Sequence, residues 1–179
     1  KYYGEDCVKK FIGQFAFAIW DKKRESLFLA RDHLGVNPLF FALVYKTFLF
    51  ASEIKAILQT GLVKKEIDKT ALYHYLSVFS IPQPHTIISS IKSLLPGSTL
   101  LVNYKGIKTN KFWQVPDRPA GQITSYEEAK YKLKNMLEKS VKSSMTADVQ
   151  VGAFLSGGVD SSSIVALMAQ NTSKKIKTY

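Results

Sequence analysis

The sequence lacks the features that define several classes of protein. It has a single cysteine, Cys7, so it cannot form a disulfide within the chain, which is typical of a reducing compartment. Its longest uninterrupted apolar runs, residues 15–20 and 39–45, are far shorter than the roughly 20 residues that span a bilayer. These absences predict a cytoplasmic globular protein that does not enter a membrane.

Acidic residues are also scarce, since 14 Asp and Glu face 25 Lys and Arg, which gives a net charge of +11. A basic protein of this kind can bind nucleic acid. Its lysines, however, are spread along the chain, with no Arg-rich run and no alternation of basic and aromatic residues. This distribution is typical of a solvated surface, so nucleic acid is not the expected partner.

The chain of 179 residues divides at a short stretch rich in proline, glycine and polar residues, 116–122. Before it, alternating apolar runs predict hairpins over 39–44 with 47–51 and over 99–104 with 107–115. Helices are expected over 53–60 and over 68–78, the latter with Asp68 as its N-cap. We therefore predict one domain over 1–116, a linker over 117–124 and a second domain over 125–179.

The second domain is expected to begin with a helix over 125–145, because Ser125 and Glu128 have the spacing of a capping box. The apolar residues of this helix recur at helical spacing and predict a buried stripe. They are Ala129, Leu133, Met136, Leu137, Val141 and Met145.

Residues 149–162 carry the most specific chemistry in the sequence. The run 149–155 is apolar or small on both faces, which predicts a strand buried on both sides in a parallel sheet. Helical spacing resumes from Ser161, so the string SGGVDSS at 156–162 occupies a strand-to-helix turn. Such turns attract anions through free backbone N–H groups and the helix dipole, and glycines let the ligand approach closely.

This turn is not a Walker A loop, because no lysine lies within it. Asp160 is unfavourable in an anion-binding turn unless a cation bridges it to phosphate, and Mg²⁺ commonly does so. The residues therefore suggest a metal–pyrophosphate site. The alternative is an ordinary glycine-rich turn in which Asp or Ser caps a helix.

The string at 156–162 resembles the PP-loop of the ATP pyrophosphatases, which cleave ATP between its α and β phosphates to adenylate a substrate. Three earlier stretches, GQFAFAIWD at 13–21, ARDHLGVNPL at 30–39 and ASEIKA at 51–56, resemble the class II glutamine amidotransferases. Taken together and in this order, these stretches resemble the family of glutamine-hydrolysing asparagine synthetases. The resemblance covers nearly the whole chain.

The resemblance implies an α+β glutaminase, the C-terminal part of an N-terminal-nucleophile αββα sandwich, followed by the start of an α/β PP-loop domain. It implies a ligase that converts aspartate to asparagine with ATP, Mg²⁺ and glutamine-derived ammonia, through β-aspartyl-AMP and with release of pyrophosphate. The implied ATP and pyrophosphate site consists of Phe154, Leu155, Ser156, Gly157, Gly158, Val159, Asp160, Ser161 and Ser162, with Asp160 on the metal. The implied ammonia-tunnel and interface residues are Gln14, Arg31, Asp32 and Val36.

The resemblance also implies what this chain should lack. The family's nucleophilic cysteine is the first residue of the mature chain, whereas position 1 here is Lys1. We therefore expect no catalytic residue in this chain, and we expect Cys7 to be a structural thiol. We expect a central fragment of a longer enzyme, inactive by itself. No zinc site is expected, because His74 and His85 have no partners at ligand spacing.

Two other functions are compatible with parts of the sequence. One is a β-lactam-synthetase-like or other amidotransferase-type ligase with the same architecture. The other is a basic PP-loop protein that binds RNA and modifies tRNA, which leaves residues 11–56 unexplained. The acceptor substrate and the oligomeric state stay open, and a homo-oligomer is compatible with the sequence.

Overall fold

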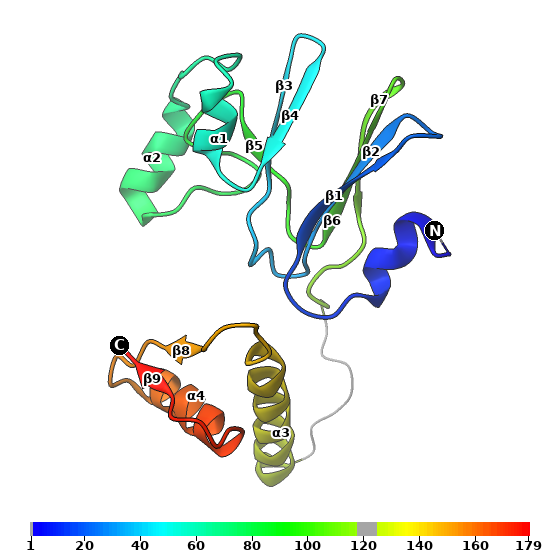
Figure 1. The fold of residues 1–179 in the computed structure, drawn as a ribbon. Coiled ribbons are helices and arrows are strands. Elements are labelled where there is room, and N and C mark those ends of the chain that lie inside the picture. The colour runs from blue at the N-terminus through cyan, green and yellow to red at the C-terminus, as the bar shows by residue number, and fades with distance from the viewer. Residues whose placement is uncertain (1, 118–124) are drawn as a thin grey trace. The chain divides into compact units, whose positions relative to one another are not determined.

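The computed structural model describes residues 2–117 and 125–179, which separate into two compact units, Lys1–Val115 and Pro116–Tyr179 (Figure 1). Of the expected linker over 117–124, all but Asp117 lies outside the described residues, and the exact domain boundaries stay a prediction. In the two described ranges, no helix is both long enough and apolar enough to cross a membrane.

The first unit contains two antiparallel sheets. One sheet has the order β1 (Ala16–Asp21), β2 (Ser26–Arg31), β6 (Ser98–Asn103) and β7 (Gly106–Lys111). The other has the order β4 (Thr47–Ala51), β3 (Phe40–Val44) and β5 (Lys92–Ser93). Both expected hairpins are present, although β7 ends four residues before the predicted limit, because the N–H groups of Phe112 and Trp113 donate instead to the carbonyl of Gly97.

In the first sheet, strand β2 is buried on both faces. On β2, Leu29 lies opposite Leu100 of β6 and packs with Leu39 and Leu94 in a cluster that joins the two sheets. Because successive residues of a strand point to opposite faces, Phe28 and Ala30 face the other way. There they pack with Val8 of the 3₁₀ helix η1 (Gly4–Lys10).

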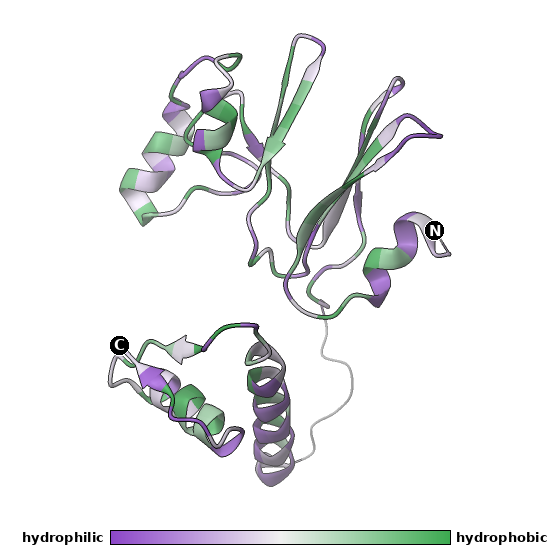
Figure 2. Ribbon diagram, in the orientation of Figure 1, coloured by the Kyte–Doolittle hydropathy of each residue, from purple (hydrophilic) through white to green (hydrophobic). Residues whose placement is uncertain are grey.

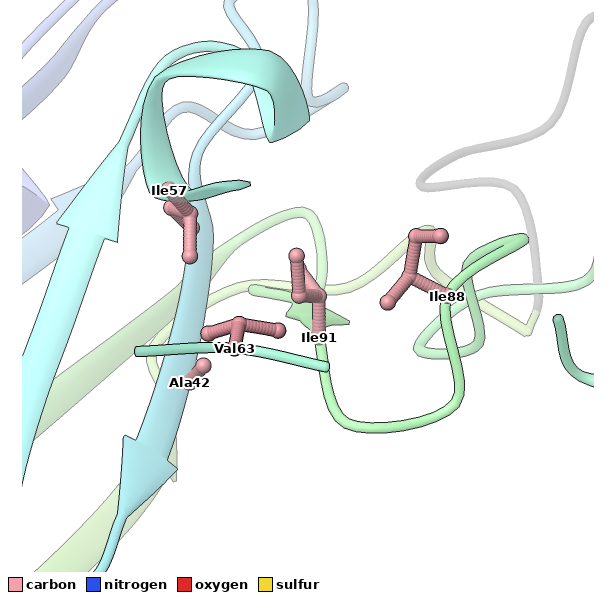
Figure 3. Close-up of a cluster of buried hydrophobic side chains, with 5 residues drawn as sticks. All are labelled: Ala42, Ile57, Val63, Ile88 and Ile91. Carbon is pink, nitrogen blue, oxygen red and sulfur yellow. The ribbon is translucent and has the colours of Figure 1, made fainter. Parts of the chain in front are cut away.

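The second sheet is covered by the helix α1 (Ile54–Gln59) and the loops around it. Their cluster consists of Ala42, Ile57, Val63, Ile88 and Ile91 (Figure 3). Helix α2 (Lys69–Val78) follows α1 along the chain, and the Asp68 carboxylate caps it by accepting from the N–H groups of Thr70 and Ala71 at 2.9 and 3.0 Å. Helical segments therefore lie outside two packed sheets, and the expected αββα layering is confirmed.

The second unit contains α3 (Tyr126–Ser144), β8 (Gly152–Ala153), α4 (Val159–Gln170) and β9 (Lys177–Thr178). The Ser125 hydroxyl accepts from the Glu128 N–H at 3.2 Å, as the capping signature predicted. Strands β8 and β9 pair in parallel, with α4 connecting them. This strand–helix–strand arrangement is the local frame of the loop at 154–158.

Two packing predictions for the second unit are wrong. The expected buried strand over 149–155 is ordered as a strand only at β8, and Val149 is exposed. On α3 only Val141 of the expected stripe is buried, while Leu133, Met136 and Leu137 are exposed. The sequence pattern marks surfaces suited to burial, but within the described part of this unit α3 packs against a single helix, α4.

Candidate functional site

The loop between β8 and α4 leaves the carboxyl end of a parallel strand. Beyond the two paired residues of β8, the N–H of Tyr179 donates to the carbonyl of Ala153 at 3.1 Å, and the N–H of Leu155 donates to the carbonyl of Tyr179 at 2.8 Å. The segment that follows β8 is thus hydrogen-bonded to Tyr179 as far as Leu155. The carboxyl ends of parallel strands are where α/β proteins bind ligands.

Gly157 and Gly158 turn the chain from this extended segment into α4. Gly157 has φ of +81°, in the left-handed region that glycine adopts without strain, and beyond its two chain neighbours no atom lies within 4 Å of the position that a Cβ would occupy. Gly158 is the N-cap, with no side chain to cap the helix. The N–H of Ser162 donates to the carbonyl of Gly158 at 3.0 Å, so the earlier N–H groups of the first turn have no acceptor inside the helix. The turn therefore offers backbone donors and a positive dipole end to an anion.

Two serine hydroxyls cross this turn. The Oγ atoms of Ser156 and Ser161 are 3.0 Å apart, and the Ser161 hydroxyl donates to the carbonyl of Gly158 at 3.2 Å. Since a hydroxyl has one proton, Ser156 is the donor to Ser161 in this arrangement. The pair ties both ends of the loop together, and rotation of either hydroxyl would present a donor to a ligand.

The apolar side chains of the motif are exposed. Phe154 is 86% exposed, Val159 is 83% exposed and Leu155 is 39% exposed. The Phe154 ring has its centroid 6.5 Å from that of Tyr179. An exposed aromatic ring beside an anion-attracting turn suits a ligand that combines a planar ring with phosphates.

Asp160 lies in the first turn of α4 and is exposed to solvent. Across the described ranges, no group of three or more His, Cys, Asp and Glu side chains gathers in a way that could hold a metal ion. Asp160 therefore supplies one carboxylate. Mg²⁺ is commonly held by one or two carboxylates together with phosphate oxygens and water, so the carboxylate fits the metal only when a phosphate ligand shares it.

The second set of predicted residues gathers around the loop between β2 and β3. Arg31 and Asp32 are buried, with 4% and 1% of their surface exposed, whereas Val36 is 52% exposed and Gln14 is exposed. Asp32 accepts from the N–H of Val36 at 3.0 Å, and its own N–H donates to the carbonyl of Phe15, the residue after Gln14. The structure thus brings the four residues to one region of the first unit.

Arg31 uses its whole guanidinium group to bind buried and half-buried acceptors. Its Nε donates to the carbonyl of Asn37 at 2.8 Å and its Nη2 to that of Gly35 at 2.7 Å. Its Nη1 donates to Leu94 O, Ser93 Oγ and Gln83 Oε1, at 2.6, 3.0 and 3.2 Å. Burial lowers the pKa of Arg31 from its ordinary value, and the adjacent Asp32 carboxylate partly opposes this change.

Asp32 is held in the charged form by backbone donors. Burial acts to raise the pKa of Asp32, but hydrogen bonds from the backbone of Asn37, Val36, Phe15 and Gly35 outweigh burial. The pKa of this carboxyl group therefore lies below its ordinary value. Asp32 acts as an anchor for the loop that carries Val36, and its satisfied hydrogen bonds do not leave it free for acid–base chemistry.

Several residues of these two regions were missed by the sequence patterns. Gln83, Ser93 and Leu94 bind Arg31 across separations of 52 to 63 residues, and no local signal marks them. Tyr179, which holds the loop at Leu155, was also missed. Periodicity and capping patterns predict only interactions between residues that are close in sequence. Contacts between residues this far apart can be identified only from the folded structure.

A groove of about 500 Å³ lies along α3 and α4 in the second unit, apart from the loop. Its lining is mostly apolar and includes Leu133, Leu137 and Leu167, together with Lys130 and Lys134. None of residues 154–162 lines it. The groove coincides with the exposed apolar stripe of α3, so it reflects an uncovered helix face, and the chemistry of the loop lies elsewhere.

Comparisons with known proteins match each of the two units to a family. Residues 1–113 match the family described as glutamine amidotransferase domain, and residues 132–179 match the family described as asparagine synthase. The chain therefore belongs to the glutamine amidotransferase family. It joins this domain to an asparagine synthase region, as the resemblance to glutamine-hydrolysing asparagine synthetases predicted, and that resemblance is confirmed.

Among its relatives, the glutamine-hydrolyzing asparagine synthetase 3 of Bacillus subtilis is 37% identical over 174 residues, covering 97% of this chain and 28% of the relative. The putative glutamine-hydrolyzing asparagine synthetase 2 of Methanocaldococcus jannaschii is 37% identical over 184 residues, covering 98% and 35%. A solved structure of glutamine phosphoribosylpyrophosphate amidotransferase from B. subtilis has a TM-score of 0.42 and 17% identity, covering 98% of this chain and 34% of that one. The chain spans about a third of the length of the curated relatives it matches.

Proposed function

We propose that this chain contributes to an ATP-dependent asparagine synthetase, a ligase that uses ammonia released from glutamine. The observation that carries the proposal is the SGGVDSS turn between β8 and α4, in a chain whose first unit belongs to the glutamine amidotransferase family. The turn supports nucleotide binding, and the family of the first unit supports glutamine as the nitrogen donor.

In this proposal the loop binds the phosphates of ATP. Free N–H groups at the start of α4 and the hydroxyls of Ser156, Ser161 and Ser162 supply donors. The open space around Gly157 lets a phosphate approach the backbone. Val159 and the serines belong to the same proposed phosphate-binding set, and we propose that Phe154 and the backbone of Leu155 hold the adenine ring, which the exposure of Phe154 supports.

Asp160 is proposed to share a Mg²⁺ ion with the phosphates. When bound, the ion would neutralise charge that develops on pyrophosphate as it leaves. The position of Asp160 supports this role, since it belongs to the first turn of α4, the same turn whose N–H groups have no acceptor inside the helix. The β-carboxylate of aspartate would then attack the α-phosphorus, forming β-aspartyl-AMP and releasing pyrophosphate, before ammonia displaces AMP to give asparagine.

In the first unit, we propose that Val36 and Gln14 line the path of ammonia and that Arg31 and Asp32 fix the loop beside it. Their geometry supports this division, because the first two are exposed and the second two are buried and fully engaged. Cys7 is not proposed as the nucleophile of glutamine hydrolysis. It lies within η1 and packs against the cluster that contains Val8, Phe28 and Ala30, which suits a structural thiol.

The test is replacement of Asp160 by Ala in the complete gene product. We expect aspartate-dependent release of pyrophosphate to be lost, while hydrolysis of glutamine continues. Asp148→Ala is the matched control, because Asp148 is an exposed carboxylate in the segment before β8. Release of pyrophosphate at the wild-type rate by the Asp160 variant would contradict the metal role, and loss of both activities in both variants would point to misfolding.

The single cysteine further supports a cytoplasmic location, which cell fractionation would test.

A further inference from the structure

The ring of Tyr179 lies against the backbone of Gly152 in β8. A Cβ atom at Gly152 would be 3.1 Å from the Cε2 atom of Tyr179 and 3.7 Å from its Cδ2 atom. The shorter distance is tighter than an ordinary contact between carbon atoms, so a side chain there would require the ring to move. The ring therefore occupies the space that a larger residue in place of Gly152 would fill.

Tyr179 also lies beside Phe154. The hydrogen bonds that join Tyr179 to Ala153 and Leu155 flank Phe154, so that Tyr179 lies opposite it in the parallel ladder. The two ring centroids are 6.5 Å apart and the rings are tilted by 59°. Figure 2 shows hydrophobic colour on the chain that leaves β8. Within the part of the chain that the structure describes, Tyr179 supplies the only ring contact of Phe154.

We propose that Tyr179 is a positioning residue for the nucleotide, which holds the Phe154 ring in the orientation that stacks on adenine. This inference rests on the proposed function, in which Phe154 holds the adenine ring. An exposed side chain that rotates freely must be immobilised when it binds a ligand, and that loss of freedom weakens binding. Contact with Tyr179 restricts Phe154 before the ligand arrives. Gly152 belongs to the same arrangement, because its lack of a side chain gives the Tyr179 ring its place.

The ring of Tyr179 carries this role without its hydroxyl group. The close approach to Gly152 is made by ring carbons, and the contact with Phe154 joins one ring to the other. Phenylalanine at this position would keep both contacts, whereas alanine would remove both. The backbone hydrogen bonds of Tyr179 do not depend on its side chain, so either substitution leaves the donor and acceptor that hold Leu155.

The test is isothermal titration calorimetry of the complete gene product with Mg²⁺ and either ATP or inorganic tripolyphosphate. Tripolyphosphate has a chain of three phosphates and no base, so its Kd reports on the phosphate-binding turn alone. We expect Tyr179→Ala to raise the Kd for ATP about fivefold and to leave the Kd for tripolyphosphate unchanged. Tyr179→Phe should bind both ligands as the wild type does.

The control is Tyr131→Ala. Tyr131 belongs to α3 and is 69% exposed, close to the 74% of Tyr179. Its replacement removes an equally exposed aromatic ring from the same unit, and we expect neither Kd to change.

Gly152→Ala tests the pair from its other side. Its methyl group displaces the Tyr179 ring, so we expect the Kd for ATP to rise about as much as in Tyr179→Ala. The methyl group also comes within 3.1 Å of the carbonyl oxygen of Lys177, and its effect in the Tyr179→Ala background measures that contact alone. We expect a much smaller effect in this background than in the wild type, since residues in contact are not additive. Equal effects in the two backgrounds would overturn the pairing of Gly152 with Tyr179.

The outcomes separate this inference from the proposed function. A wild-type Kd for ATP in Tyr179→Ala would overturn the inference, as would an equal rise in the Kd for tripolyphosphate, because the substitution would then act on the structure of the turn. Binding by Tyr179→Phe as weak as that by Tyr179→Ala would also overturn it. If ATP binds with the expected pattern but aspartate causes no release of pyrophosphate, the proposed function fails and the role of Tyr179 stands. Absence of ATP binding by the wild type would overturn both.

Discussion

Arg31 and Asp32 bind opposite sides of one residue, Asn37. The Asp32 carboxylate accepts from the N–H of Asn37 at 3.1 Å, and the Arg31 Nε donates to its carbonyl at 2.8 Å. These neighbouring side chains therefore fix both the donor and the acceptor of a single residue. Because the loop runs from β2 of one sheet to β3 of the other, the pair holds the connection between the two sheets.

Replacing Arg31 by Lys should destabilise the first unit strongly. Lysine keeps the charge but lacks the planar fork that reaches Gly35, Asn37 and Leu94 together, so buried carbonyl groups would lose their donors. We expect the free energy of unfolding to fall by about 2–4 kcal/mol. Urea titration followed by tryptophan fluorescence measures it, since both tryptophans, Trp20 and Trp113, belong to this unit.

The control for this prediction is Arg24→Lys, because the Arg24 side chain is 74% exposed and lies 4.0 Å from Asp21. Exposed ion pairs of this kind contribute little, so this variant should unfold at nearly the wild-type urea concentration. Equal effects of the two substitutions would show that the buried network around Arg31 contributes no more to the free energy of unfolding than the exposed Arg24–Asp21 pair.

The carboxylate of Asp32 should make the first unit sensitive to acid. Its pKa in the folded state lies below the ordinary value of about 3.9, so the unfolded chain binds the proton more readily. The resulting stability is present above about pH 4 and is lost as the pH falls through the lower, folded-state pKa. In Asp32→Asn that dependence is absent, and the free energy of unfolding at pH 7 should be lower by about 2 kcal/mol.

The measurement is a series of urea titrations from pH 7 down to acid conditions for the wild type, Asp32→Asn and Asp6→Asn. Asp6 is an exposed carboxylate paired with Lys9 at 2.7 Å, and its replacement should leave the slope with pH unchanged. If Asp32→Asn retained the wild-type slope below pH 4, other carboxyl groups would be responsible for the acid sensitivity.

The features that the sequence predicted correctly are those encoded by neighbours along the chain. Asp68 and Ser125 cap their helices as expected, because a cap depends on a side chain and the N–H groups two or three residues later. The turn at Gly157 follows from local chemistry in the same way. The network of Arg31 could not be predicted, since its acceptors at Gln83 and Ser93 are set by the packing of two sheets. The stripe of α3 was misassigned because periodicity predicts a surface suited to burial and does not identify what covers it.

Alanine substitutions at Gly157 and Gly158 should separate the geometry of the loop from its proposed ligand. Gly157 has φ of +81°, so an alanine there is strained, and we expect a loss of about 1 kcal/mol in the stability of α4. Gly158 has φ of −74°, and its added Cβ would lie 3.6 Å from the Ser156 Oγ, an ordinary contact. In the Gly158→Ala variant, the stability of α4 should stay within about 0.5 kcal/mol of the wild type. The reason is that the weaker N-cap is offset by the lower conformational entropy of the unfolded chain. Hydrogen exchange at the amides of α4 measures both effects.

Gly158→Ala then becomes the sharper probe of ATP binding, because α4 stays formed. If phosphate approaches the loop backbone as proposed, the added methyl group occupies part of its path. We expect the KM for ATP in aspartate-dependent pyrophosphate release to rise at least about tenfold in the complete gene product, which corresponds to about 1.4 kcal/mol of binding energy. Glutamine hydrolysis serves as the internal control and should not change. An unaltered KM for ATP in a variant whose α4 amides exchange at the wild-type rate would place the nucleotide away from this loop.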